Sequence, residues 1–157
     1  MWIYQILASL FSRLSPLFAL VNSKLRKQLQ GQRNSLKQLS NFTKKGKLVW
    51  IHVASLGEYE QALPIIDRIK QKQTETQIAL SFFSPSGYEY AAKKAPVDLV
   101  FYLPWDTQSK AKKVIQLLNP DLALFVKYDL WPNYINELKN SGCPTYLVAA
   151  RFYKEQW

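Results

Sequence analysis

From residue 48 onward, short apolar runs alternate with segments in which apolar residues recur at helical spacing. The apolar runs lie at residues 48–54, 77–83, 98–103, 121–126 and 144–150. Helices are expected between them at residues 58–72, 87–94, 107–118 and 130–141. Strands without polar alternation are typical of parallel sheets that are covered on both faces. The pattern therefore predicts an α/β fold, a Rossmann-like, doubly wound parallel sheet with its ligand site at the carboxyl ends of the strands.

The first 22 residues carry a different pattern, in which large apolar residues recur every three or four positions. They include Trp2, Ile6, Leu10 and Leu14, and a proline at position 16 predicts a kink. Arg13 interrupts the apolar run after twelve residues, whereas a membrane-spanning helix needs about 20. We therefore expect an amphipathic helix that lies in the membrane interface. Two alternatives stay open: a helix packed on its own domain, or a tilted span.

Positive charge is concentrated at the amino end of the chain. The net charge is +10, and residues 1–47 hold nine Lys and Arg residues but no Asp or Glu. Residues 23–47 are expected to be helical and to end in a basic turn, and the remainder of the chain is nearly neutral. A basic front end suits an anionic partner, either a phospholipid surface or nucleic acid. We accordingly divide the chain into a membrane-interface segment, residues 1–47, and a Rossmann-like domain, residues 48–157.

Composition argues against several kinds of site. Hydrophobic residues make up 48% of the chain, which is enough for a packed core. The single cysteine, Cys143, cannot form an intramolecular disulfide, and with the single histidine, His52, it is too few for an ordinary zinc site. The sequence has neither a GxGxxG nor a Walker motif, so it predicts no dinucleotide or P-loop site. We expect no metal and no cofactor.

Polar residues follow the predicted strands at the edge where a ligand is expected. They are Ser55, Gly57 and Glu58 after the first strand, Ser84, Ser86 and Gly87 after the second, Lys127 and Asp129 after the fourth, and Arg151 after the fifth. Glu58, at the start of a helix, suits a general base that takes a proton from a hydroxyl group. The two helix starts, near Gly57 and Gly87, offer free N–H groups to a phosphate.

The serine and glutamate residues at these helix starts also have a purely structural interpretation. Ser55 and Glu58 match a capping box, in which the serine accepts from one helix N–H and the glutamate reaches back to another. Ser86 and Glu89 repeat this spacing at the next helix.

Other candidate residues have structural interpretations as well. Asp129 suits the N-cap of the helix near residue 132, and Asp106 suits the N-cap of the helix at residue 107. Trp131 has the character of a core or rim aromatic, and Lys127 that of a solvated lysine. His52 lies inside a buried strand pattern, which predicts a hydrogen-bonded core histidine.

Five sequence blocks, taken in order, resemble those of a known family. Residues 50–58 (WIHVASLGE) look like the H-x-x-S-x-G-E signature of the transferases for 3-deoxy-D-manno-octulosonic acid (Kdo). Residues 83–89 (FSPSGYE), 102–106 (YLPWD) and 130–133 (LWPN) are similar to three further blocks of that family. Residues 150–151 (AR) stand where the family has a small residue followed by arginine. The resemblance covers about residues 48–151.

The resemblance implies a GT-B glycosyltransferase, in which two Rossmann-like domains face each other across a cleft. The N-terminal domain would bind the lipid A precursor and the C-terminal domain the donor CMP-Kdo, and Kdo would pass to an acceptor hydroxyl without a metal. The match to the motif assigns Glu58 as the catalytic base. The residues expected to bind the acceptor and its phosphates are Ser55, Gly57, Ser84, Ser86, Gly87, Lys127, Asp129 and Arg151. The reaction would take place at the cytoplasmic face of the bacterial inner membrane, with no nucleic acid as partner.

Two departures from the family pattern change what is expected. The family often has acid-x-acid ahead of L-W-P-N, where this chain has Lys127, Tyr128 and Asp129. We expect Lys127 to attract the acceptor phosphate or the Kdo carboxylate instead of acting as an acid. The chain ends at Trp157 without a donor domain, so it is expected to be inactive alone and to need that domain in cis or in trans.

Two other functions stay open. One is a different GT-B transferase that uses a lipid-linked acceptor. The other is a non-catalytic module that binds membranes or nucleic acid through its basic front end, in which Glu58 would be only a helix cap.

Overall fold

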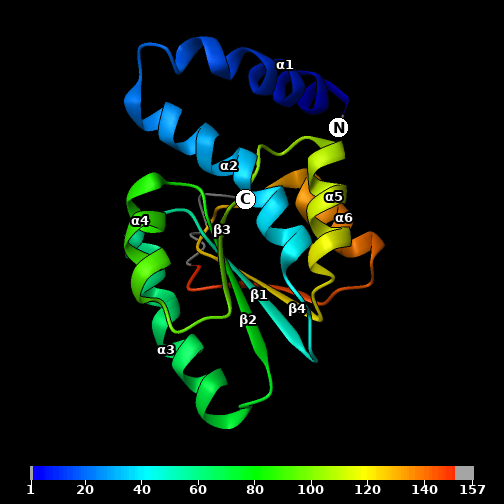
Figure 1. The fold of residues 1–157 in the computed structure, drawn as a ribbon. Helices are drawn as coiled ribbons and strands as arrows, with labels where there is room; N and C mark the ends of the chain where they lie inside the picture. The colour runs from blue at the N-terminus through cyan, green and yellow to red at the C-terminus, as the bar shows by residue number, and fades with distance from the viewer. Residues whose placement is uncertain (1, 151–157) are drawn as a thin grey trace.

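The computed structural model describes residues 2–150 and contains one parallel sheet with helices on both faces (Figure 1). The strands are β1 (Leu48–Val53), β2 (Gln77–Phe82), β3 (Leu99–Tyr102), β4 (Leu122–Val126) and β5 (Thr145–Val148). The helices are α1 (Trp2–Phe18), α2 (Ser23–Asn41), α3 (Leu56–Lys72), α4 (Pro85–Lys94), α5 (Gln108–Leu118) and α6 (Pro132–Asn140). The Rossmann-like α/β prediction is confirmed, and the ends of the elements from residue 48 onward differ from the predicted ends by at most two residues.

The strand order β3-β2-β1-β4-β5 places β1 in the centre of the sheet. The chain runs from β1 outward to β2 and β3, and then returns to the other side of β1 to form β4 and β5. The order of the strands therefore reverses between β1 and β4, which is the position where open α/β sheets bind ligands. His52 of β1 lies in register with Ser81 of β2 and with Phe125 of β4, beside this switch point.

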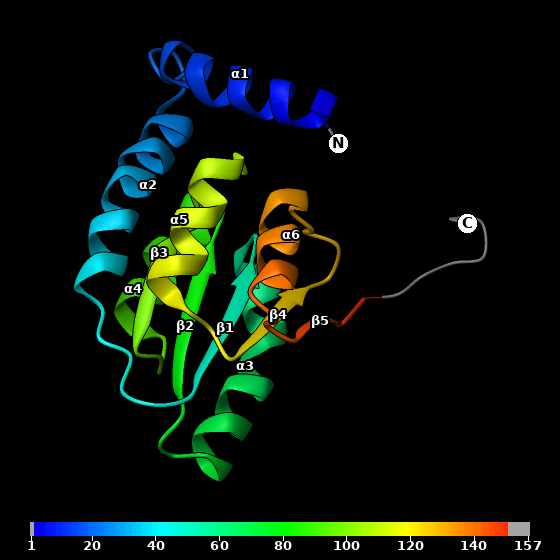
Figure 2. The ribbon, with the colours of Figure 1, turned by 90° about the vertical axis from the view of Figure 1, so that its right-hand side faces the viewer.

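Both faces of the sheet are covered, which explains why the strand runs are apolar throughout. Helices α2, α5 and α6 pack on one face, and α3 and α4 pack on the other (Figure 2). Trp50 is fully buried on the first face, where its ring makes edge contacts with Phe125 and Tyr134. Ile51 and Ile66 are fully buried on the second face. All six residues of β1 are buried, as expected for a central strand.

Helix α2 packs closely against β3 at a glycine. A Cβ atom at Gly31 would lie 2.2 Å from the ring of Tyr102, so only glycine allows this approach. Leu39, near the end of α2, is 1% exposed in the core. Beyond Asn41 the chain is not helical, and Lys44 holds it to the sheet by an ion pair of 2.7 Å with Asp121.

Helix α1 lies across the carboxyl ends of the strands and turns sharply into α2 (Figure 2). It contains Pro16, and its large apolar side chains are 39% to 69% exposed. Most of these side chains are therefore open to solvent, although Phe11 packs on Trp105 and Tyr4 bonds Asp106 of the domain, as the alternative of a helix packed on its own domain predicts. In the described part of the chain, no single helix has the length and apolar composition of a membrane span. Only α1 and α2 taken as a pair, with a bend of 120°, pass that test.

Candidate functional site

The amino end of α3 follows β1 directly, at the carboxyl edge of the sheet. Ser55 is the N-cap: its hydroxyl accepts a hydrogen bond from Glu58 N at 3.4 Å. The Glu58 carboxylate accepts a hydrogen bond from Ala54 N through Oε2, one residue before the N-cap, so the cap by Ser55 is confirmed, whereas Glu58 does not bond a helix N–H as predicted. Among the described residues, no donor contacts the other carboxylate oxygen of Glu58, which leaves it able to accept a proton.

Helix α4 begins after β2 in a similar way, but a different serine caps it. Ser84 is the N-cap, and its hydroxyl accepts a hydrogen bond from Gly87 N at 3.5 Å and lies 3.0 Å from Ser86 Oγ. The predicted capping box of Ser86 and Glu89 is therefore wrong, because the helix already begins at Pro85. The Glu89 carboxylate forms an ion pair with a lysine of α2 instead.

The amino ends of α3 and α4 lie against each other. Ser84 N donates a hydrogen bond to Ala54 O at 2.9 Å, which joins the two loops. A Cβ atom at Gly87 would lie 2.6 Å from the ring of Phe82 and 3.1 Å from the first backbone nitrogen of α3, so this position requires glycine. A Cβ atom at Gly57 would meet nothing within 4 Å. The predicted residues of these two loops therefore form one group, with open space beside Gly57.

A buried chain of hydrogen bonds connects the core to Asp129 on the other side of β1. Trp50 Nε1 donates to Ser81 Oγ at 2.9 Å, and Ser81 Oγ lies 2.8 Å from His52 Nδ1. The assignment that satisfies these atoms has the serine hydroxyl donating to Nδ1, so His52 carries its proton on Nε2 and donates it to Asp129 Oδ2 at 2.7 Å. Trp131 Nε1 donates to the same oxygen at 3.0 Å.

This chain of bonds settles two predictions. His52 is a fully buried and hydrogen-bonded core histidine, as expected, but it also fixes the orientation of a carboxylate at the ligand edge. Asp129 is not the N-cap of α6, because Trp131 occupies that position and makes no side-chain cap bond. The Asp129 side chain is 26% exposed, and its contacts with His52 and Trp131 both involve Oδ2.

Asp106 caps α6 rather than α5, which corrects the sequence-based prediction. Its carboxylate accepts hydrogen bonds from Asn133 N at 3.0 Å and Tyr134 N at 3.1 Å, whereas Thr107 at the start of α5 makes no side-chain cap bond. The Tyr4 hydroxyl of α1 donates to the same carboxylate at 2.7 Å. Burial, together with the nearby Asp106, raises the pKa of both tyrosines. Asp106 thus holds α1 and α6 together.

Lys127 follows β4 in a strained backbone conformation. Its φ is 60°, and Ala149 after β5 has a φ of 55°; both values lie in the left-handed region that non-glycine residues rarely adopt. Lys127 N donates to Val148 O at 2.8 Å, which holds the turn in place. No carboxylate within residues 2–150 pairs with the Lys127 ammonium. Strain of this kind is concentrated at functional sites.

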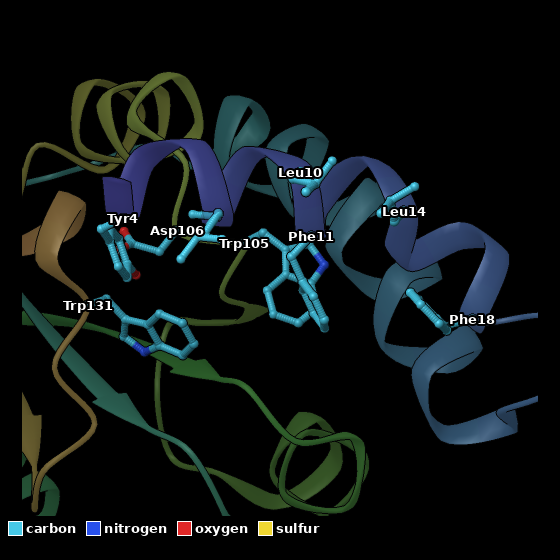
Figure 3. Close-up of a pocket in the computed structure, with 10 residues that line it drawn as sticks. Tyr4, Leu10, Phe11, Leu14, Phe18, Trp105, Asp106 and Trp131 are labelled. Atoms are coloured by element: carbon cyan, nitrogen blue, oxygen red, sulfur yellow. The ribbon is translucent and has the colours of Figure 1, made fainter. Parts of the chain in front are cut away.

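An apolar cavity of about 470 Å³ separates α1 from this edge of the sheet (Figure 3). Phe11 of α1 packs edge-on against Trp105 at 4.9 Å, and Phe83 contacts both Trp105 and Trp131. Figure 3 shows Trp131 on the wall opposite α1, with Phe18 at the far end of the helix. These aromatic residues, which carried no functional prediction, connect α1 to the site. Their proximity depends on the tertiary arrangement of α1 and was not visible in the sequence.

The structure therefore places the predicted residues in two groups beside the carboxyl end of β1. One group surrounds the starts of α3 and α4, and the other consists of Lys127 and Asp129 after β4. No hydrogen bond between described residues joins Glu58 to Asp129. Arg151 lies outside the described residues. In the described part of the chain, no group of three His, Cys, Asp or Glu residues is arranged to hold a metal ion.

Comparison with known protein families identifies the group to which this arrangement belongs. The sequence model of a family described as 3-deoxy-D-manno-octulosonic-acid transferase (Kdo transferase) matches residues 23–157, which is most of the chain. The chain belongs to this family. The match includes both groups of site residues, and the resemblance seen in the sequence blocks is confirmed.

Several relatives carry the name 3-deoxy-D-manno-octulosonic acid transferase. The relative from Chlamydia trachomatis is 30% identical over 108 residues, 68% of this chain and 25% of its own length. That from Haemophilus influenzae is 32% identical over 105 residues, 66% of this chain and 24% of its own length. The Aquifex aeolicus protein is 36% identical over 92 residues, 58% of this chain and 25% of its own length. The chain thus matches about a quarter of the length of each of these relatives.

Proposed function

We propose that this chain is the acceptor-binding half of a GT-B glycosyltransferase that moves Kdo from CMP-Kdo to the lipid A precursor. The observation that carries the proposal is the position of Glu58 in a chain of the Kdo transferase family: its carboxylate stands at the ligand edge of the sheet with one oxygen held and the other without a donor among the described residues. A positioned carboxylate of this kind suits a general base.

In the proposed reaction, Glu58 takes the proton from an acceptor hydroxyl. The hydroxyl oxygen then forms a bond to the anomeric carbon of Kdo, the bond from that carbon to the CMP phosphate breaks, and CMP leaves with the electron pair. The hydrogen bond from Ala54 N fixes the carboxylate while it acts. The open space beside Gly57 would let the acceptor hydroxyl approach the carboxylate oxygen of Glu58 that has no donor among the described residues.

The acceptor phosphates would bind at the starts of α3 and α4 and at Lys127. The two helix starts present adjacent backbone N–H groups and the positive ends of two helix dipoles, which favour an anion. The Lys127 ammonium has no acidic partner among the described residues, so it is able to pair with a phosphate or with the Kdo carboxylate. Asp129, held by His52 and Trp131, would orient a hydroxyl of the bound sugar.

Helix α1 would place this site at the cytoplasmic face of the bacterial inner membrane. Its exposed side chains include Trp2, Ile3 and Leu17, each more than half exposed, and the segment that follows is basic. This combination suits a helix that lies in the interface of an anionic membrane. The apolar cavity between α1 and Trp131 would receive an acyl part of the lipid acceptor.

A direct test measures binding and transfer separately. This chain is titrated with phosphatidylcholine vesicles that contain either the lipid A precursor or phosphatidylglycerol, and is then joined to the remaining part of the Aquifex aeolicus relative for a Kdo transfer assay. We expect saturable preference for the lipid A precursor, and transfer by the joined protein but not by either half alone. Equal binding to both vesicles and no transfer would indicate a membrane-binding module without catalytic function.

A further inference from the structure

A second cavity, of about 380 Å³, lies where α1 crosses α2 and α5. Its polar lining comes from all three helices and from the loop before α5: Ser12, Ser15, Gln32, Arg33, Trp105 and Lys110. None of the described residues that line it is acidic. The cavity is separate from the group around Glu58, and neither the sequence blocks nor the proposed reaction uses its basic residues.

The donors that line this cavity are poorly satisfied by the protein. Within the described residues, Lys110 Nζ donates only to Ser12 Oγ, at 2.8 Å, although an ammonium has three protons to donate. Burial without a paired carboxylate lowers the pKa of Lys110. Trp105 Nε1 is buried and finds no acceptor in residues 2–150. Arg33 makes no hydrogen bond or ion pair with any described residue.

A buried N–H group without an acceptor is costly unless something pairs with it, and the half-buried Lys110 has protons left to donate, while Arg33 at the rim is exposed. One compact acceptor with several oxygen atoms and negative charge would suit three donors that line one cavity from separate elements. A phosphate ester has this chemistry: it offers charged oxygens in several directions and forms strong hydrogen bonds with Lys and Arg. A metal cation is excluded by the charge of Arg33 and Lys110, which line the same cavity.

We propose that the cavity between α1, α2 and α5 binds the phosphate ester of an anionic ligand through Arg33, Lys110 and Trp105. A lipid headgroup is one source of that phosphate, because the exposed apolar side of α1 lies beside the cavity and would accommodate the lipid tails. A soluble phosphate ester is the other source. The inference goes beyond the transfer reaction and does not depend on Glu58, so the two proposals fail independently.

The test follows the indole N–H resonances of the ¹⁵N-labelled chain during titration with three probes. The probes are inorganic phosphate, glycerol 3-phosphate and dihexanoyl phosphatidylglycerol below its micelle concentration, and Trp105→Phe assigns the Trp105 signal. We expect a saturable shift of this signal, while the signal of Trp50, which is bonded to Ser81 in the core, stays in place. Tighter binding of the short-chain lipid than of glycerol 3-phosphate would assign the site to a headgroup. Equal binding would assign it to a soluble ester.

Two matched variants separate a built site from general attraction to negative charge. Lys110→Met removes a charge inside the cavity, and Lys112→Met removes one from the exposed side of the same helix. We expect Lys110→Met to weaken binding by about tenfold to a hundredfold, and Lys112→Met by about fivefold or less. Thermal melting checks that both variants fold. Equal losses in the two variants, with no shift of the Trp105 signal, would overturn the proposal.

Discussion

At the amino edge of the sheet, acidic residues are tied to a lysine and to a neighbouring strand, whereas the carboxyl edge keeps polar groups without partners. Asp121, just before β4, accepts a hydrogen bond from Leu48 N of β1 at 2.7 Å and pairs with Lys44. Asp98, just before β3, accepts from a backbone nitrogen of β2 at 2.8 Å and pairs with Lys70. Each carboxylate thus accepts a hydrogen bond from a backbone N–H near the start of a neighbouring strand and also pairs with a lysine.

The carboxyl edge is built in the opposite way. Lys127 and Ala149 hold left-handed backbone conformations there, and the Trp105 indole and Thr107 hydroxyl are buried without a partner among the described residues. Strain and unsatisfied donors lower stability unless a ligand compensates for them. The amino edge of this domain therefore supports the fold, whereas the carboxyl edge keeps groups without partners among the described residues, as the proposed binding role requires.

Asp106 is an exception on the carboxyl edge, because its carboxylate is fully used by the fold. Asp106→Ala would leave the backbone N–H groups of Asn133 and Tyr134 and the Tyr4 hydroxyl without their acceptor. We expect a loss of about 3 kcal/mol or more in the free energy of unfolding, measured by urea denaturation. Tyr4→Phe, which removes one of the three bonds, should cost about 0.5–1.5 kcal/mol. Equal costs for the two variants would mean that Asp106 does not cap α6.

The two glycines at the helix starts should respond in opposite ways to alanine. Gly87→Ala forces a Cβ atom against the ring of Phe82, so we expect a loss of about 1–3 kcal/mol of stability. In Gly57→Ala the added Cβ atom contacts no atom within 4 Å, so the substitution should leave the stability unchanged or raise it by up to about 1 kcal/mol. The same substitution should weaken acceptor binding, because it fills the space beside Glu58. Denaturation and acceptor titration of both variants check this pair, and unchanged acceptor affinity in Gly57→Ala would count against a ligand at that position.

Lys127 should contribute to binding at the expense of stability. Glycine adopts a positive φ without strain, whereas alanine at the same position keeps the strain. The Lys127→Gly variant should therefore be about 1 kcal/mol more stable than the Lys127→Ala variant. Both variants lose the ammonium and should bind the acceptor more weakly than the unmodified chain. Comparing the two melting curves isolates the backbone strain from the loss of charge. If neither variant changes acceptor affinity, Lys127 does not contact a phosphate.

The acids of the amino edge should make stability fall in acid. Hydrogen bonds from Lys44 and Leu48 N lower the pKa of Asp121. A lowered folded-state pKa adds stability above the pKa of the unfolded chain, and this contribution is lost as the pH falls below about 4. Asp121→Asn should therefore lower the free energy of unfolding by about 1 kcal/mol or less at pH 7. In acid, the stability of this variant should fall less steeply with pH than that of the unmodified chain. Asp67→Asn, on the exposed side of α3, is the control and should leave that dependence as it is.

The sequence was sufficient to predict the elements but not every contact between them. The strands were predictable because β1, β2 and β4 are buried on both faces and therefore carry runs of apolar residues. The capping pair Ser55 and Glu58 was predictable because both partners are local. The cap of α6 was not, since Asp106 lies 27 residues before the nitrogen that it accepts from.

The cavities and the polar chain to Asp129 also escaped prediction. Trp105 and Lys110 come close to α1 only because that helix lies across the end of the sheet, a packing that no local pattern encodes. His52 and Asp129 are 77 residues apart, so the spacing in the sequence does not show that they bond. The family resemblance indicated the candidate site residues, whereas the contacts between them could be described only from the tertiary structure.

The decisive measurement is Kdo transfer by a Glu58→Gln variant, because it asks whether Glu58 acts as the base. The assay uses this chain joined to the donor part of a Kdo transferase, with Glu60→Gln, an exposed neighbour on α3, as the matched control. Glutamine keeps the hydrogen bond from Ala54 N but cannot take a proton, so we expect an unchanged melting temperature and a loss of activity of about 10²-fold or more. Glu60→Gln should keep both the melting temperature and the transfer activity of the unmodified protein. Full activity in Glu58→Gln, with or without a loss of stability, would contradict the account and leave Glu58 as a helix cap alone.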